Sequence, residues 1–171
     1  MRGLDDLVRQ GKILYAGISD APAWWTAQAN TLAELRGWTR FAAIQIEYNL
    51  IRRTVERDQI PVAKALNLGV TAWSPLEQGV LSGKYHGRNN AEVGRMSAPQ
   101  MQEFLPKQER PQRIVSAVES VAKETERSMA QVALAWLGHR SVPVTPSLER
   151  ESCRNSKTIL QASICSCLTN R

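Results

Sequence analysis

Short apolar runs alternate with helical segments through most of this 171-residue chain. Three of these runs, at 13–18, 42–46 and 70–73, have the length and composition of buried strands and follow one another at a nearly constant spacing. Parallel strands joined by helices need crossover connections, which place the helices outside the sheet. The pattern therefore predicts an α/β protein with a parallel sheet, and a fourth strand is expected at 141–144.

The constant spacing favours strands that are successive neighbours in a (β/α)8 barrel, although spacing alone leaves a doubly wound sheet open. Four strands cannot close an eight-stranded barrel, so the two outer strands would present unpaired backbone groups. Helices are expected at 1–10, from Pro22 onward, and at 55–66, 112–124 and 128–137. The apolar residues that give the second of these its helical periodicity are Trp24, Trp25, Leu32 and Leu35.

Composition narrows the class of protein further. A hydrophobic content of 43% and a charged content of 22% are those of a soluble globular domain. No apolar run approaches the ~18 residues of a membrane span, and no signal peptide precedes the first helix, so a cytoplasmic protein without a membrane partner is expected. The net charge of +6 is interleaved rather than clustered, which argues against a nucleic-acid partner.

The segment 69–85 carries the strongest local signal of function. Its apolar run ends at Trp73 and breaks at Ser74-Pro75 into a loop with two glycines that ends on Lys84. Backbone N–H groups can approach an anion where there is no Cβ, and a lysine adds charge. This arrangement is typical of an anion-binding loop, although an ordinary strand-to-loop connection would have the same spacing.

The other predicted strands also end in residues that can bind a ligand. In a barrel, ligands bind where the strands end and the βα loops begin. The residues at those ends are Ser19-Asp20, Gln45, Trp73 to Leu76, and Val144-Thr145. Hydrogen-bonding groups and an aromatic ring are therefore expected to meet on one rim. The remaining tryptophans, Trp24, Trp25, Trp38 and Trp136, are interpreted as packing residues.

Three segments together resemble the aldo-keto reductase family. They are Leu-Asp-Asp-Leu-Val-Arg-Gln-Gly-Lys-Ile-Leu-Tyr-Ala-Gly-Ile-Ser-Asp (4–20), Ile-Gln-Ile-Glu-Tyr-Asn-Leu (44–50) and Trp-Ser-Pro-Leu-Glu-Gln-Gly-Val-Leu-Ser-Gly-Lys-Tyr (73–85). They stand in the family's order and spacing and cover residues 1 to about 144. The resemblance implies a partial (β/α)8 TIM barrel, roughly its last four βα units, with outer helices.

The resemblance also implies an NADP(H) site. Ser19, Asp20 and Gln45 would bond the nicotinamide carboxamide, Trp73 would stack on the ring, and the following loop would cradle the pyrophosphate. Most members carry asparagine where this chain has Asp20, so an amide donor is replaced by a carboxylate. The implied cofactor-binding residues are Ser19, Asp20, Gln45, Trp73, Ser74, Pro75, Leu76, Gln78, Gly79 and Lys84. No metal site is expected.

The family's reaction is hydride transfer to or from a carbonyl substrate, with a tyrosine as general acid. The resemblance places that tyrosine and its partners on strands that precede Met1, so no catalytic residue is assigned, and Tyr15, Tyr48, His86 and His139 are rejected as substitutes. Three hypotheses follow: an NADP(H)-dependent oxidoreductase that is inactive in this form, a non-catalytic binding protein of the same fold, or an inactive truncated product. A complementary N-terminal half is an expected partner.

The last part of the sequence departs from the family pattern. All three cysteines, Cys153, Cys165 and Cys167, lie there, and 145–171 contains no family motif. The absence of histidines and neighbouring ligands argues against a metal or disulfide framework. We expect a separate, disordered tail after residue 144, and a shifted reading frame would explain it.

Overall fold

The computed structural model describes residues 1–85 and 109–148. Four strands form one parallel sheet whose spatial order is also their order along the chain. They are β1 Ala16–Ser19, β2 Phe41–Glu47, β3 Gly69–Trp73 and β4 Val144–Pro146. This order has no reversal, as expected for consecutive strands of a barrel. The prediction of a partial α/β barrel with parallel strands is confirmed.

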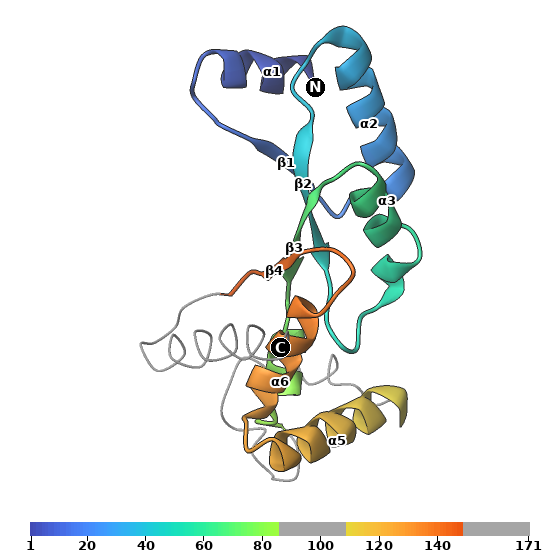
Figure 1. The fold of residues 1–171 in the computed structure, drawn as a ribbon, viewed down its shortest axis with the longest axis vertical. Coiled ribbons are helices and arrows are strands. Elements are labelled where there is room, and N and C mark those ends of the chain that lie inside the picture. Colours follow the sequence, from blue (N-terminus) through green and yellow to red (C-terminus); the bar gives the residue numbers. More distant parts are fainter. Residues whose placement is uncertain (86–108, 149–171) are drawn as a thin grey trace, which may run out of the picture.

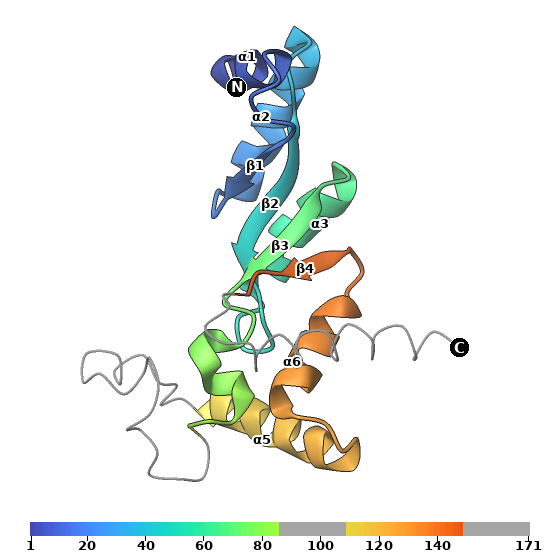
Figure 2. The ribbon, with the colours of Figure 1, turned by 90° about the vertical axis from the view of Figure 1, so that its left-hand side faces the viewer.

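Helices connect and cover the strands. In chain order they are α1 Arg2–Arg9, α2 Ala23–Arg36, the 3-10 turn η1 Thr54–Glu56, α3 Gln59–Ala65, the 3-10 segment η2 Glu77–Ser82, α5 Glu109–Glu124 and α6 Met129–Gly138. Helices α2 and α3 lie side by side on one side of the sheet (Figure 1). In the perpendicular view, strands β1 to β3 lie in front of these two helices (Figure 2). Within residues 1–85 and 109–148, α2 and α3 therefore cover one face of these strands and leave the other face uncovered.

The alternation of side chains along β2 accounts for this difference between the faces. Ile44 and Ile46 are buried against the helices, whereas Gln45 is exposed on the opposite face. The register pairs Gln45 with Ser19 on one side and with Thr71 on the other, so the open face is polar. The main core lies on the covered face and comprises Ile44, Ile46, Tyr48, Ile60, Ala63, Leu68, Val70, Ala72, Leu137 and Val142. Burial of these side chains fixes which face of the sheet remains available to a ligand.

A second core lies beyond the carboxyl ends of the strands. It joins the loop after β2 to η2, α5 and α6, and its buried members are Ile51, Val80, Leu81, Val115, Val118 and Ala133. Helix α6 begins with a capping box in which Ser128 and Gln131 bond each other's backbone N–H groups. The loop that follows β3 is therefore packed against a hydrophobic cluster of its own.

Several predicted bounds differ from the structure, and three of the differences affect the sheet or its connections. The first strand begins at Ala16 rather than at residue 13, because 13–15 precede the part of β1 that pairs with β2. The predicted helix at 55–66 is divided into η1 and α3. Pro61 has no N–H to continue the hydrogen-bond ladder, and it is tolerated because it lies in the first turn of α3. The last strand is Val144–Pro146 rather than 141–144, so the sheet continues past the predicted domain boundary at residue 144.

The large apolar side chains of α2 are not packing residues, contrary to the prediction for Trp24 and Trp25. Trp24 is 67% exposed and Leu35 is 79% exposed. The buried face of α2 instead carries small or polar residues, Ala23, Thr26, Asn30 and Ala33. Asn30 exchanges two hydrogen bonds with the backbone of Phe41, which lets α2 approach the start of β2 closely. Trp136 does pack against the main core, as predicted.

Within residues 1–85 and 109–148, no helix is long and apolar enough to cross a membrane. The same residues contain no cluster of histidine, cysteine, aspartate or glutamate that could hold a metal ion. Ser147 donates its backbone N–H to Ala72 at 2.8 Å, which anchors the chain just after β4. The cysteines, His86 and most of the predicted tail lie outside the described residues.

A matched pair of leucine truncations tests the placement of the main core. Leu137 in α6 is fully buried, and we expect Leu137→Ala to lower the free energy of unfolding by about 2–5 kcal/mol. Leu35→Ala, on the exposed face of α2, should change it by less than about 0.5 kcal/mol. Urea unfolding followed by circular dichroism measures both. Equal losses in the two variants would contradict the exposed position of Leu35.

Candidate functional site

Four of the predicted site residues meet at the carboxyl ends of β1, β2 and β3. Ser19 donates its hydroxyl to Gln45 Oε1 at 3.3 Å, and the same hydroxyl lies 3.3 Å from Asp20 Oδ2. Trp73 donates its indole N–H to Asp20 Oδ1 at 3.0 Å. The parallel register brings these ends to one edge although Asp20 and Trp73 are 53 positions apart in the chain. The predicted convergence on one rim is therefore observed.

Asp20 owes its position to the backbone. Its φ of 50° is left-handed, a conformation that aspartate and asparagine adopt more readily than most residues. Its N–H donates to Gln45 O at 3.0 Å, which extends the pairing of β1 with β2 by one residue. The side chain is thereby directed across the end of β2 toward Trp73. This geometry holds the indole by its edge and leaves the aromatic ring at the rim.

The loop after Trp73 is built from several left-handed residues. Ser74 has a φ of 50°, and Glu77, Gln78 and Gly79 follow one another at 47°, 52° and 96°. Such conformations cost roughly 1–2 kcal/mol for each residue with a side chain. The Ser74 hydroxyl accepts the backbone N–H of Gln78 at 3.3 Å, which closes the turn. A loop of this shape persists only where other contacts offset its cost.

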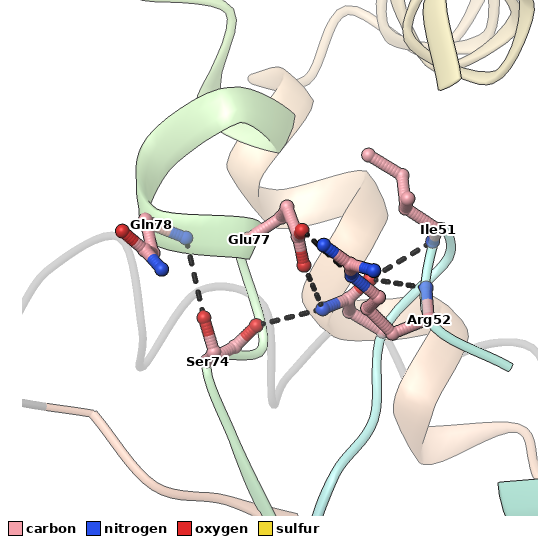
Figure 3. A network of polar contacts seen from close by, with 6 residues as sticks. Ile51, Arg52, Ser74, Glu77 and Gln78 are labelled. Atoms are coloured by element: carbon pink, nitrogen blue, oxygen red, sulfur yellow. Dashed lines mark hydrogen bonds and ion pairs between the residues drawn. The ribbon is translucent and has the colours of Figure 1, made fainter. Parts of the chain in front are cut away.

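The contacts that hold the loop centre on Asn49 and Glu77. Figure 3 shows Glu77 facing Arg52, with Ser74 and Gln78 on the same loop. Asn49 is fully buried and donates its amide to Ser74 O at 3.0 Å and to Glu77 Oε2 at 2.8 Å. Its Oδ1 accepts the backbone N–H groups of Ile51 and Arg52 at 2.9 and 2.8 Å. Arg52 in turn donates to Glu77 Oε1 at 3.0 Å. This network ties the loop after β2 to the loop after β3 and fixes both at the rim.

Lys84 folds back over the loop at Gly79. A Cβ at Gly79 would collide with Lys84 Cε and would lie 2.9 Å from Lys84 Nζ. The φ of 96° at Gly79 favours glycine, and the absence of a side chain there lets Lys84 lie against the backbone. Lys84 is exposed on the same loop that begins at Ser74, and its Nζ lies 5.0 Å from the centre of the Tyr85 ring. The predicted juxtaposition of a glycine and a terminal cation is present.

Pro75 and Leu76 are placed differently from the polar residues of the site. Pro75 is buried, and the side chain of Leu76 packs against the second core. The backbone carbonyl of Leu76 accepts the N–H groups of Gly79 and Leu81, at 3.0 and 3.1 Å. These two residues therefore shape the loop, and their side chains are used for packing. Gln78 is exposed beside Ser74.

Sequence reasoning missed the roles of Asn49, Arg52 and Glu77. Two sequence features could have pointed to these residues. Asn49 is a polar residue directly after an apolar strand, and Glu77 lies inside the third family-like segment. The sequence did not indicate that Glu77 is buried, or that it bonds Arg52 and Asn49, which lie 25 and 28 positions earlier. These three residues position the loop and are not themselves candidate ligands of an anion.

Glu47 shares the open face of the sheet with Gln45 and pairs in register with Trp73. Partial burial raises the pKa of Glu47, and the neighbouring carboxylates of Glu77 and Asp20 add to the rise, while Arg52 opposes it. Burial is the largest cause of this raised pKa, and the acidic groups at the end of β2 add to it. The rim beside Trp73 is therefore electrostatically negative, in contrast to the loop at Lys84.

These residues fit a nicotinamide dinucleotide. Three hydrogen-bonding side chains, Ser19, Asp20 and Gln45, border a part-buried indole, which suits a flat ring bearing an amide. Gly79 lies against the ammonium of Lys84, and a backbone without a Cβ beside a cation suits a phosphate. Hydrogen-bonding groups and an aromatic ring thus lie at the ends of β1 to β3, and a cation lies on the loop that follows β3.

The sequence is similar to known proteins along most of its length. The sequence model described as "Aldo/keto reductase family" matches residues 1–163, a range that runs past residue 144. The versiconal hemiacetal acetate reductase of Aspergillus parasiticus is 33% identical over 142 residues, which cover 82% of this chain and 41% of that protein. The aryl-alcohol dehydrogenase [NADP(+)] of Phanerodontia chrysosporium is 34% identical over 149 residues, covering 85% and 38%. The norsolorinic acid reductase of Aspergillus flavus is 27% identical over 163 residues, covering 95% and 39%.

The parallel strands and their flanking helices form a partial α/β barrel, and the matching sequence model identifies its family. The chain belongs to the aldo/keto reductase family. It spans about two fifths of the length of the curated relatives it matches.

The network around Asn49 can be tested by truncation. Asn49→Ala removes both donor and acceptor from a fully buried position, and we expect a loss of about 2–4 kcal/mol in the free energy of unfolding. Gln28→Ala, which removes an exposed amide from α2, is the control and should cost less than about 0.5 kcal/mol. Urea unfolding gives both values. A loss in Asn49→Ala no larger than that of the control would show that the loops are held by other contacts.

The raised pKa of Glu47 predicts how stability depends on pH. A carboxyl whose pKa is raised by folding favours the native state when protonated, and this contribution is lost as pH rises through the folded pKa. Glu47→Gln should therefore raise the thermal midpoint at pH 7, and the gain should shrink below about pH 4. Glu34→Gln, at an exposed position of α2, is the control. Thermal unfolding at both pH values measures the difference, and an equal gain at the two would contradict the assignment.

Proposed function

We propose that this chain forms the nicotinamide and pyrophosphate site of an NADP(H)-dependent oxidoreductase that interconverts carbonyl compounds and alcohols. The observation that carries the proposal is the Ser19, Asp20, Gln45 and Trp73 cluster at the ends of three parallel strands. Membership of the family supports it, as does the relative from Phanerodontia chrysosporium, whose name includes NADP(+). A small carbonyl compound is the proposed substrate class.

Each residue of the site has a separate task in this proposal. Gln45 and Ser19 bond an amide and so select which face of the attached ring is presented. Trp73 supports the ring, and Lys84 neutralises phosphate charge over Gly79. The bound nicotinamide supplies or accepts the hydride. The chain's own contribution is therefore binding and orientation.

The positions of the three tyrosines support the proposal that the proton donor is not supplied by this chain. Tyr48 is 1% exposed and donates its hydroxyl to Glu56 Oε1 at 2.7 Å. Burial and this carboxylate raise the pKa of Tyr48 to about 12, far from that of a working general acid. Tyr15 precedes β1 at the opposite end of the strand, and Tyr85 packs against the second core.

A second proposal concerns a partner. Strand β1 is at the edge of the described sheet, and Leu14 and Tyr15 beside it are about four-fifths exposed. Unpaired strand edges with neighbouring apolar side chains associate readily with further strands. We propose that additional β/α units, from a longer polypeptide or a second chain, pair with this edge and supply the proton donor. A Leu14→Glu and Tyr15→Glu double variant should then lose association with such units in a pull-down, and unaltered association would contradict the proposal.

Cofactor binding is tested by NADPH fluorescence on the purified 171-residue chain. Trp73→Leu removes the aromatic support and should weaken binding by roughly tenfold. Trp24→Leu, which alters an exposed tryptophan of α2, should leave binding unchanged. Lys84→Ala should weaken binding by a few-fold, with a smaller effect at high salt because screening already weakens the charge.

Two outcomes would contradict the proposed function. One is the absence of NADPH binding by the chain, and the other is equal binding by the Trp73→Leu and Trp24→Leu variants.

A separate measurement tests whether the chain has catalytic activity. We expect no NADPH oxidation by the chain above the buffer rate when a carbonyl compound is added, and measurable turnover would refute the proposal that the proton donor comes from elsewhere.

A further inference from the structure

Asp20 is fixed at the border of the indole ring. Its Oδ1 accepts the Trp73 Nε1 proton at 3.0 Å, and Oδ2 lies 3.3 Å from the Ser19 hydroxyl. An indole N–H lies in the plane of its ring, so the carboxylate lies at the ring's edge and leaves both faces free of it. Any flat group held on Trp73 consequently has a carboxylate at its border.

The charge of this carboxylate is not neutralised by a cation among the described residues. The ion pairs found in 1–85 and 109–148 do not include Asp20, and the nearby Arg52 is paired with Glu77 at 3.0 Å. Glu47 senses Asp20 as a repulsive neighbour, which contributes to the raised pKa of Glu47. The edge around Trp73 therefore carries uncompensated negative charge close to the proposed ring position.

The two redox forms of a nicotinamide differ in the charge of the ring, and a neighbouring carboxylate interacts with that charge. The oxidised ring is a cation and the reduced ring is neutral, while the phosphates and the carboxamide are the same in both. Contacts with the carboxamide and phosphates therefore contribute almost equally to the binding of either form. A carboxylate beside the ring contributes to their difference.

We propose that Asp20 makes this site discriminate between the redox forms of its cofactor by binding the oxidised, cationic nicotinamide more tightly than the reduced one. The inference rests on the proposed function and extends it from cofactor class to cofactor form. Its functional meaning is a bias of the bound cofactor toward hydride donation, and so toward carbonyl reduction, because tighter binding of the oxidised form stabilises the product of that transfer. Asp20 acts here as a specificity residue for the cofactor and not as a proton carrier.

Asp20→Asn isolates the charge. Asparagine keeps an oxygen that can accept the Trp73 N–H, and it tolerates the left-handed backbone at this position. Dissociation constants for NADP+ and NADPH are measured by calorimetry and by NADPH fluorescence at low ionic strength. The ratio of the NADP+ constant to the NADPH constant should rise roughly three- to tenfold in Asp20→Asn, the size expected for one partly solvated charge nearby.

Two controls accompany this variant. Asp6→Asn makes the same chemical change at an exposed position of α1 and should leave the ratio at its wild-type value. Raising the ionic strength should reduce the wild-type preference, because screening weakens the attraction between Asp20 and the ring. Circular dichroism confirms that both variants are folded.

The outcomes separate the two proposals. An unchanged ratio in Asp20→Asn, or an equal weakening of both forms, overturns the redox discrimination and leaves the proposed cofactor site intact. If the wild-type chain binds neither form, the proposed function fails and this inference fails with it. A ratio that changes equally in Asp6→Asn shows a general charge effect and also overturns the role of Asp20.

Discussion

Parallel pairing of strands whose two faces differ in polarity is the constraint on which the rest of the structure depends. Residues such as Ile44 and Ile46 must be buried against the helices, and period-two alternation then sends Gln45 to the other face. Because the pairing is parallel, the carboxyl ends of β1, β2 and β3 meet at one edge. A one-residue slip would bury Gln45 and expose the core, so the site is specified by the same burial that stabilises the sheet.

The rim also depends on a buried polar network that has no role of its own in binding. Asn49 and Glu77 are enclosed between two loops and satisfy one another and the surrounding backbone. Left-handed residues at 77–79 are unfavourable by themselves, and the network compensates for them. The shape of the loop at Gly79 and Lys84 therefore depends on contacts made by residues that precede it by about 25 positions.

Parts of the fold and of the candidate site could be predicted from the sequence, and other parts could not. The strand order and the meeting of Ser19, Gln45 and Trp73 follow from hydrophobic periodicity and parallel pairing, both of which are local or nearly local properties. The exposure of Trp24 and Trp25 could not be predicted, because a hydrophobic pattern marks a helix face without saying whether another element covers it. On α2 the buried residues are small or polar, and one of them, Asn30, bonds the backbone at the start of β2. The pairing of Asp20 with Trp73 was likewise inaccessible, since it depends on a left-handed backbone and on side-chain rotamers.

The separation of charge along the rim determines the orientation in which an elongated ligand binds. Acidic groups cluster beside Trp73, at Asp20 and Glu47, whereas the ammonium of Lys84 lies over Gly79 at the other end. An elongated ligand with a cationic head and an anionic tail meets matching charges in one orientation and opposing charges in the other. The charges along the rim therefore favour one orientation of such a ligand over the reverse. A symmetric dianion of the same length has no preferred orientation on this rim.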